Sequence, residues 1–465
     1  MTICNPMNLS YRFQLAGGQH HTEPCREAAD PSVVFYKGAY WLFASKSGGY
    51  WRSSDLADWR FVPTEGLPTE DYAPDAAVVD GRIVVTASRR GEPCPVFRSD
   101  DPGADAWEHV TDHPAHWDPA IFQDDDGRVY RYWGCSDREP LYGQELDRRT
   151  LEPIGAVVEV YHPDPSRFGW ERRGDDHASD APPWIEGAWM DKRAGRYYLQ
   201  YAGPGTEFNV YNDATLIGEA PLGPFEVQGH NPLSYKPRGF TTGAGHGSSF
   251  QDRHGNWWHI TTMRIAVKHN FERRLGLFPA GFDEDGRMFC NTAFGDWPMR
   301  RPEGPWDPWR DAFAGWMLLS RGGAVEASSA IADHPPALAV DEDIRTYWVA
   351  DDEAEPWIGV DLGAVSMIHA LQINFAEHHA ELRGRGGADA CYRYRVDGSV
   401  DGTAWFTLAD RSDDAADLPH DYHELGQPAE ARHVRLTVEH VPSGATAVSG
   451  LRVFGRGPGD APAPP

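Results

Sequence analysis

Residues 1–300 contain a repeated pattern of two apolar stretches separated by a short polar turn. In one copy, the apolar run that follows Asp30 passes through Lys37-Gly38 into Tyr40-Trp41-Leu42-Phe43. Apolar runs of about four to eight residues, bounded by Gly, Asp or Asn, are typical of strands in β-hairpins. The pattern therefore predicts five hairpins, each headed by a titratable residue: Asp30, Asp75, Asp118, Glu186 and His246.

The spacing of these hairpins predicts a β-propeller. Roughly 40–50 residues separate the first three heads, which is the length of one blade built from short strands. The last two steps are longer because they contain polar insertions, residues 161–181 and 203–242. Insertions between blade strands form loops on one face, often the binding face. We therefore predict five blades over residues 1–300 and little helix.

The pattern changes beyond residue 300. Three prolines, Pro302, Pro305 and Pro308, prevent regular strand pairing, so residues 301–319 are predicted to form a linker. Short alternating apolar stretches follow, and their spacing is typical of an antiparallel β-sandwich over residues 320–457. Residues 458–465 are rich in Gly, Pro and Ala and are predicted to be a disordered tail.

Composition supports an all-β protein of two or three domains. The 465 residues include 48 Gly and 37 Pro, which suit many turns, and 40% are hydrophobic, enough to fill sizeable cores. The formal net charge of −27 repels nucleic acid and anionic membranes and favours neutral or cationic ligands. These observations exclude nucleic acid and membrane as expected partners.

The N-terminus and the cysteines predict a cytoplasmic protein. Residues 1–6 have neither the basic region nor the apolar core of a signal peptide. A protein secreted after removal of such a segment would show the same sequence. The six cysteines have no CxxC pair and no zinc spacing, so we expect reduced packing residues: Cys4, Cys25, Cys94, Cys135, Cys290 and Cys391.

Equivalent positions on the first strands of propeller blades converge on the central channel. If the five heads are equivalent, they surround one pocket. Carboxyl groups gathered there repel one another and shift their pKa values apart, which separates acid and base roles. Two carboxyl groups on opposite sides of a sugar are what glycoside cleavage needs, about 6.5–9.5 Å apart where a water attacks directly.

Three tetrapeptides in order, one per blade, resemble glycoside hydrolase family 43: Ala29-Asp30-Pro31-Ser32, Trp117-Asp118-Pro119-Ala120 and Trp184-Ile185-Glu186-Gly187. The segment 50–59 is similar as well, and the likeness covers about residues 5–300. The resemblance implies a five-bladed propeller and an inverting glycosidase. It implies that Asp30 is the general base, that Glu186 is the general acid, and that Asp118 holds the acid and keeps its pKa raised.

Further residues are candidates for binding substrate. By the resemblance, His246 contacts substrate or a bound ion, and Arg273 contacts substrate, although Arg274 fits almost as well. Asp75 either contacts substrate or packs in the channel. Trp51 and Trp189 either stack on a sugar or pack in the core. We expect no metal in the chemical step, and a structural Ca²⁺ or Na⁺ in the channel is compatible with the sequence.

The second domain resembles the discoidin or coagulation-factor type C sandwich, a galactose-binding-like jelly roll. The likeness rests on Asp341–Trp348, Trp357–Gly363, Tyr394–Trp405 and Arg432–Leu436. These residues mark the core and turns of that fold, and no sugar-binding set can be carried over. A carbohydrate-binding role and a structural role beside the propeller both stay open.

The expected function is an inverting exo-glycosidase that removes terminal pentose or furanose residues from oligo- or polysaccharides, of the α-L-arabinofuranosidase or β-xylosidase type. A β-D-galactofuranosidase is a rival assignment, because a hexofuranose such as galactofuranose differs from a pentofuranose by one hydroxymethyl-bearing carbon. A non-catalytic glycan-binding propeller is an alternative of another class. The sequence does not predict the oligomeric state.

Overall fold

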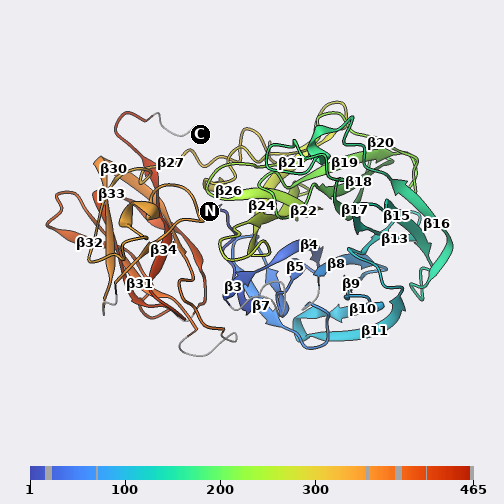
Figure 1. The fold of residues 1–465 in the computed structure, drawn as a ribbon, viewed down its shortest axis with the longest axis horizontal. Coiled ribbons are helices and arrows are strands. Elements are labelled where there is room, and N and C mark those ends of the chain that lie inside the picture. The colour runs from blue at the N-terminus through green and yellow to red at the C-terminus, as the bar shows by residue number, and fades with distance from the viewer. Residues whose placement is uncertain (16–22, 70–71, 352–354, 383–389, 415, 461–465) are drawn as a thin grey trace.

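The computed structural model describes residues 1–15, 23–69, 72–351, 355–382, 390–414 and 416–460. Strands dominate these ranges, and helix is limited there to the 3-10 turns η1 (Pro102–Ala104), η2 (Gly169–Glu171) and η3 (Pro336–Ala339). Figure 1 shows two all-β bodies side by side, with the N-terminus between them. No helix in the described ranges is long and apolar enough to cross a membrane.

The larger body is the predicted five-bladed β-propeller. Each blade is an antiparallel sheet whose strands follow chain order from the channel outward. The first blade consists of β4 (Ala29–Tyr36), β5 (Ala39–Ser45), β6 (Gly49–Ser53) and β7 (Trp59–Pro63), and the second of β8 (Tyr72–Val79), β9 (Arg82–Ser88), β10 (Cys94–Asp101) and β11 (Ala106–His113). The third consists of β12 (Ala120–Gln123), β13 (Val129–Trp133), β15 (Leu141–Leu146) and β16 (Pro153–Tyr161), and the fourth of β17 (Ile185–Arg193), β18 (Arg196–Gly203), β19 (Asn212–Gly218) and β20 (Phe225–Val227). The fifth consists of β22 (Thr242–Gln251), β23 (Trp257–Arg264), β24 (Arg273–Phe282) and β25 (Met288–Cys290).

Short strands complete the fourth blade and the N-terminal region. β14 (Cys135–Ser136) pairs with the inner strand β17, and β21 (Ser234–Tyr235) pairs with β19. β1 (Thr2–Ile3) pairs with β26 (Met299–Arg300), and β2 (Arg12–Leu15) pairs with β3 (Pro24–Glu27).

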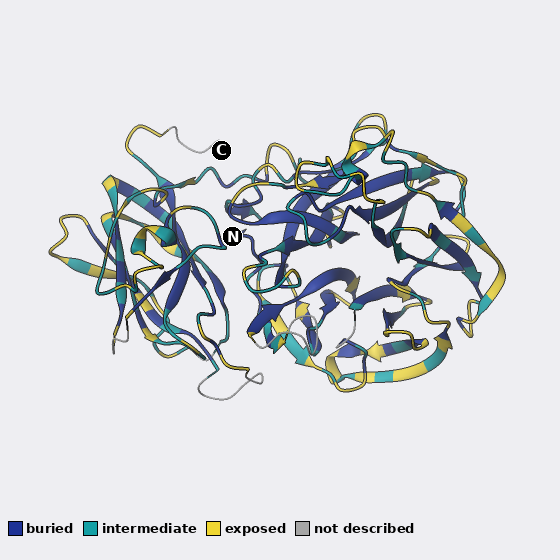
Figure 2. Cartoon of the chain, in the orientation of Figure 1, coloured by how far each residue is buried: buried dark blue, intermediate teal, exposed yellow. Residues whose placement is uncertain are grey.

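Side-chain packing closes the ring. The first and last blades form separate sheets, and one apolar cluster joins them, including Val33 and Leu42 from the first blade and Trp258 and Ile260 from the last. Figure 2 shows that the inner strands are largely buried, whereas the outer strands β11 and β16 have many exposed positions.

An irregularity recurs where the chain enters each blade. One residue there has a left-handed backbone: Asp30, Ala73, Asp118, Gly187 or His246, with φ between 48° and 63°. In four of the five blades it lies within a register shift of the inner hairpin. A β-bulge of this kind removes a residue from the ladder and re-aims its side chain. The five left-handed residues, four of them in bulges, come together along the channel.

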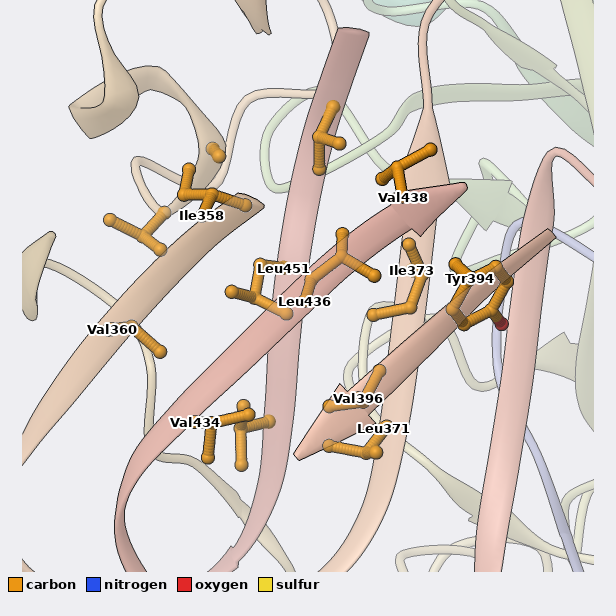
Figure 3. Packing of buried hydrophobic residues seen from close by; sticks show 14 of the residues in the cluster. Ile358, Val360, Leu371, Ile373, Tyr394, Val396, Val434, Leu436, Val438 and Leu451 are labelled. Atoms are coloured by element: carbon orange, nitrogen blue, oxygen red, sulfur yellow. The ribbon is translucent and has the colours of Figure 1, made fainter. Parts of the chain in front are cut away.

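The smaller body is the predicted β-sandwich. Two long strands, β30 (Trp357–Phe375) and β33 (His420–His440), pair along most of their length, and both shift register on the way. The flanking strands are β27 (Met317–Leu318), β28 (Ala324–Ala327), β29 (Trp348–Val349), β31 (Arg393–Ser399), β32 (Trp405–Asp410) and β34 (Ala447–Arg456). Figure 3 shows the apolar core between the layers, with Ile358, Leu371, Tyr394, Leu436 and Leu451 facing one another.

Charged side chains are buried where the sandwich meets the propeller. Arg452 of β34 is 1% exposed, pairs with Glu342 at 3.0 Å, and donates to the backbone oxygen of Asp296 on the propeller at 2.5 Å. The N-terminal strand also contacts the sandwich, since the Thr2 amide donates to Glu424 at 2.6 Å. The predicted tail lies partly outside the described residues, at 461–465.

Candidate active site

A pocket of about 520 Å³ opens at the end of the channel where the bulges lie, and every blade contributes to its wall. The lining residues are Asp30, Tyr72, Arg90, Trp117, Asp118, Cys135, Arg173, Trp184, Glu186, Gly205, Thr206, Glu207, His246, Phe271 and Arg273. The set includes the three predicted catalytic residues together with His246 and Arg273. The predicted insertions close one side, where Arg173 and Glu207 form an ion pair at 2.8 Å.

Asp30 is buried and surrounded by donors. Arg273 lies 3.2 Å from Oδ1, His246 Nδ1 lies 3.3 Å from the same oxygen, and the Ser45 hydroxyl donates to Oδ2 at 2.6 Å. Burial by itself raises the pKa of a carboxyl group. Here the charges of Arg273 and His246 and the hydrogen bonds from Ser45 and Thr262 outweigh burial, so the pKa of Asp30 is lowered. Asp30 is therefore an ionised carboxylate at neutral pH.

Asp118 has a similar backbone setting and a different charge environment. Its amide donates to the Ser88 hydroxyl at 2.8 Å, as the Asp30 amide does to Thr262. Burial raises the pKa of Asp118 to about 7; His246 opposes this rise, and the Glu186 and Asp30 carboxylates add to it. Asp30 and Asp118 thus differ in protonation because of their neighbours.

Glu186 is held by three donors. The Tyr211 hydroxyl donates to Oε1 at 2.5 Å, while the Trp184 indole at 2.8 Å and the Cys135 thiol at 3.1 Å donate to Oε2. Cys135 is the cross-strand partner of Glu186 in the β14–β17 pair, which explains the contact. The carboxyl group is fixed in orientation with 9% of the residue exposed.

Gly187 makes room for His246. At φ 63° it occupies the bulge position, and a Cβ there would lie 2.6 Å from Cδ2 of the His246 ring. The ring packs against this glycine and places Nδ1 3.3 Å from Asp30 and 3.9 Å from Asp118. Burial lowers the pKa of His246, but Asp30, Asp118 and Glu186 outweigh it, and the pKa is raised.

For Asp75 and Trp51, each expected either to contact substrate or to pack inside the protein, the structure shows packing. In the second blade the bulge residue is Ala73, and Asp75 stands two positions later, where the first blade has Ser32. Asp75 lies deeper in the channel and accepts a hydrogen bond from the Ile121 amide of the next blade at 2.8 Å, so it does not line the pocket. Trp51 is 0% exposed in the core between blades and offers no face to a sugar.

The predictions for Trp189, for the Arg273–Arg274 pair and for the cysteines agree with the structure only in part. Trp189 is half-buried, donates to Asp191 at 3.1 Å and lines the narrow channel instead of the pocket. Between the two arginine candidates, Arg273 faces Asp30, whereas Arg274 faces the sandwich. All six cysteines are free, but Cys135 lies in the pocket and is not a packing residue.

Sequence reasoning missed Tyr211, Trp184 and Cys135 as partners of Glu186. Trp184 belongs to the motif Trp184-Ile185-Glu186-Gly187. Because it lies two residues before Glu186, both side chains point to the same side of an extended chain. Tyr211 and Cys135 lie outside the repeated hairpin pattern, so no periodic signal marks them.

One group of residues in the pocket could hold a metal ion. Ligand atoms of Asp118, Glu186 and His246 lie within 4.8 Å of one another, the only such group among the described residues. Both oxygens of Glu186 also accept hydrogen bonds, and His246 Nδ1 faces Asp30 and Asp118. We derive no chemical step through a metal.

Comparisons with known proteins agree with this architecture. The family model for glycosyl hydrolases family 43 matches residues 25–288, and that for the F5/8 type C domain matches residues 324–451. The latter confirms the predicted discoidin-like domain. A solved structure titled glycoside hydrolase superposes with a TM-score of 0.54 at 21% identity, covering 92% of this chain and 97% of that chain. At that identity the likeness shows the fold alone.

Relatives by sequence are distant. The xylosidase/arabinosidase 43A of Humicola insolens is 27% identical over 258 residues, which cover 47% of this chain and 73% of that protein. A beta-D-galactofuranosidase of Aspergillus niger is 24% identical over 264 residues, covering 48% and 69%. The chain spans only 40% of a beta-xylosidase of Xylanibacter ruminicola, with 29% identity over 130 residues. Because the family model covers more than half of the sequence, the chain belongs to glycosyl hydrolase family 43.

Proposed function

We propose that this protein is an inverting exo-glycosidase that removes terminal pentose or furanose residues. The observation that carries the proposal is the convergence of Asp30, Asp118 and Glu186 on one pocket, where the pKa of Asp30 is lowered and that of Asp118 is raised to about 7. An inverting glycosidase needs one carboxylate to activate water and one carboxylic acid to protonate the leaving oxygen.

Asp30 is assigned as the general base. Its lowered pKa keeps the carboxylate free to take a proton from water as the water attacks the anomeric carbon. Arg273 and Ser45 fix the direction of the carboxylate, so that the attacking water is oriented before reaction.

Glu186 is assigned as the general acid and Asp118 as its partner. With a pKa of about 7, Asp118 is partly protonated near neutral pH, and one of its oxygens lies within 4.8 Å of a Glu186 oxygen. Glu186 passes the proton to the oxygen of the leaving group, and its three donors stabilise the carboxylate that results. Inversion follows because attack and departure take place on opposite faces of the sugar.

The shape of the site supports exo action. Beyond Asp30, Asp118 and His246 the pocket narrows to a channel of about 20 Å³, and Arg173 and Glu207 line one side of the pocket. Trp117 is 40% exposed at the wall and offers an apolar face beside Asp118. A pocket closed at one end accepts a chain terminus more readily than an internal segment.

The identity of the sugar is tested with nitrophenyl glycosides. Relatives named for xylosidase, arabinosidase and galactofuranosidase activity support a panel of 4-nitrophenyl β-D-xyloside, α-L-arabinofuranoside and β-D-galactofuranoside. Turnover of the galactofuranoside alone favours the rival assignment. Binding of sugar with no turnover of any member favours a glycan-binding propeller.

The roles are tested with Glu186→Gln and Asp30→Asn. General acid–base groups contribute typically 10²–10⁴-fold each. Loss of Glu186 should cost less with a nitrophenyl leaving group, which departs without protonation, than with the matching disaccharide. Loss of Asp30 should cost the same with both substrates. The reverse pattern exchanges the two roles, and full activity in both variants refutes the enzyme assignment.

A further inference from the structure

Two neighbouring strands have the catalytic base on one side and the sandwich on the other. β3 ends at Glu27, and β24 begins at Arg273; the Ala28 amide donates to the Arg273 carbonyl at 3.3 Å. Successive side chains on a strand point to opposite faces. Glu27 and Arg273 accordingly face the channel, while Arg26 and Arg274 face the sandwich, and all four are buried with 0–3% exposure.

On the channel side, Arg273 joins Glu27 to the base. Its Nη2 donates to Glu27 Oε1 at 2.5 Å and its Nε to the same oxygen at 3.1 Å. The remaining nitrogen, Nη1, lies 3.2 Å from Asp30 Oδ1. The position of the guanidinium relative to Asp30 therefore depends on where β3 holds Glu27.

On the other side, the sandwich supplies the anions that neutralise Arg26. Asp417 accepts two hydrogen bonds from Arg26, at 2.8 and 2.7 Å, and Glu377 lies 2.9 Å from its Nε. Glu377 follows β30, and Asp417 precedes β33, so both come from one end of the sandwich. Arg26 itself is 0% exposed and would be an uncompensated buried charge without them.

Arg274 is held in the same way. Its Nε donates to His420 Nε2 at 2.8 Å, and His420 Nδ1 lies 3.0 Å from Asn374 Oδ1. These contacts fix a neutral imidazole that accepts from arginine and donates to the amide oxygen. Burial and the two nearby arginines lower the pKa of His420 well below its usual value, which is consistent with that tautomer. Glu377 lies 3.7 Å from Arg274 and links the two arginines.

We propose that Glu377, Asp417 and His420 of the sandwich are positioning residues for the base Asp30, acting through Arg26–Glu27 and Arg273–Arg274. This edge of the sandwich then supports the catalytic site of the propeller, whether or not the sandwich also binds carbohydrate. The proposal rests on the assignment of Asp30 as the base. Its physical basis is that the sandwich contacts fix Arg26 and Arg274. These two arginines are adjacent in sequence to Glu27 and Arg273, which set the charge beside Asp30.

The charges around Asp30 determine what should be measured. Arg273 from β24 and His246 from β22 favour its carboxylate, whereas Glu27 from β3 and the carboxyl group of Asp118 oppose it. A displaced Arg273 leaves the opposing charges in place. The pKa of Asp30 then rises, and activity is lost at a higher pH on the acid side of the profile.

The test uses the full chain with Glu377→Gln and, separately, Asp417→Asn. The measurement is the pH dependence of kcat/KM with the nitrophenyl glycoside that the unmodified protein hydrolyses fastest. An opposite charge within about 4–6 Å lowers a carboxyl pKa by about 1–3 units. Partial displacement of Arg273 should move the acid limb upward by about 0.5–1 unit and lower kcat, while the basic limb stays in place.

Glu342→Gln is the matched control. It removes a carboxylate from another buried interface arginine, Arg452, whose side chain also donates to Gln372 and to the Asp296 backbone oxygen, both outside β3 and β24. We expect a lower Tm for Glu342→Gln with an unchanged acid limb. If Glu377→Gln does not fold, Asp417→Asn decides, because Asp417 has a side chain 15% exposed and tolerates solvation.

Two outcomes overturn the proposal: an acid limb that stays at its original pH in the variants that fold, or an equal shift in Glu342→Gln. Asp30→Asn separates this failure from failure of the proposed function. If Asp30→Asn is inactive and the interface variants keep the original limb, only the positioning role is wrong. If Asp30→Asn retains activity, the assignment of the base is wrong.

Discussion

Replacing Gly187 with alanine should disable the site without unfolding the protein. The added Cβ would lie 2.6 Å from Cδ2, 2.8 Å from Cγ and 2.9 Å from Nε2 of His246. Non-bonded carbon atoms rest about 3.5–4.0 Å apart. The imidazole must therefore move by about 1 Å, and that movement disturbs its 3.3 Å contact with Asp30.

The size of the effect follows from two separate costs. Alanine at the φ of 63° costs roughly 1–2 kcal/mol, which lowers the stability of the fold. A misplacement of about 1 Å in a catalytic site costs on the order of 10²-fold in rate. We expect kcat/KM to fall about 100-fold while Tm falls by only a few degrees.

Gly195→Ala separates these costs. Gly195 lies in the β17–β18 turn of the same blade at φ 81°, and its added Cβ meets nothing within 4 Å. Gly195→Ala therefore has the energetic cost of a left-handed alanine without a collision between its Cβ and another side chain. Both variants are assayed with a nitrophenyl glycoside and by thermal unfolding. Equal activity of Gly187→Ala and Gly195→Ala at similar Tm would refute the argument that the glycine exists to seat His246.

Three further outcomes are expected. Cys135→Ala should lower kcat about 10–100-fold by removing a donor to Glu186, whereas Cys135→Ser should recover most of it; equal activity of the two variants contradicts a hydrogen-bonding role. Proton NMR should show the inverted anomer as first product, and a chelator should leave the rate unchanged; retention or full loss contradicts the proposed mechanism. Because burial raises the folded-state pKa of Asp75 to about 8, its contribution to stability declines as pH rises from about 4 to 8. The Tm advantage of Asp75→Asn should therefore grow across that range, and a constant difference would contradict the assigned pKa.

The three candidate catalytic residues were accessible to sequence reasoning because they head a repeated hairpin. The register of the second hairpin was misplaced for a specific reason: the equivalent positions are the left-handed residues before Pro31, Pro74 and Pro119, and in the second blade that residue is the uncharged Ala73. Choosing the nearest charged residue shifted the second blade by two positions. Aligning the three prolines would have avoided the shift.

Other features depend on contacts between distant parts of the chain. Trp51 was a candidate for stacking because composition cannot distinguish an aromatic in a blade core from one in a pocket. Arg26 and Asp417 are separated by 391 positions, and no local pattern connects them. The packing of the sandwich against β3 and β24 therefore emerged only from the three-dimensional structure.

The left-handed residue at the start of each blade gives the narrow channel five equivalent positions. In four of the five blades this residue lies in a bulge, where it has no ladder partner, so it can change while the sheet behind it stays the same. Asp30, Asp118, Gly187 and His246 hold four of these positions, and the fifth holds Ala73, in a conformation that Asp, Asn and His adopt more readily. Ala73 lines the narrow channel and not the wider pocket, so the channel lining could be changed at this position without replacing any residue of the pocket wall.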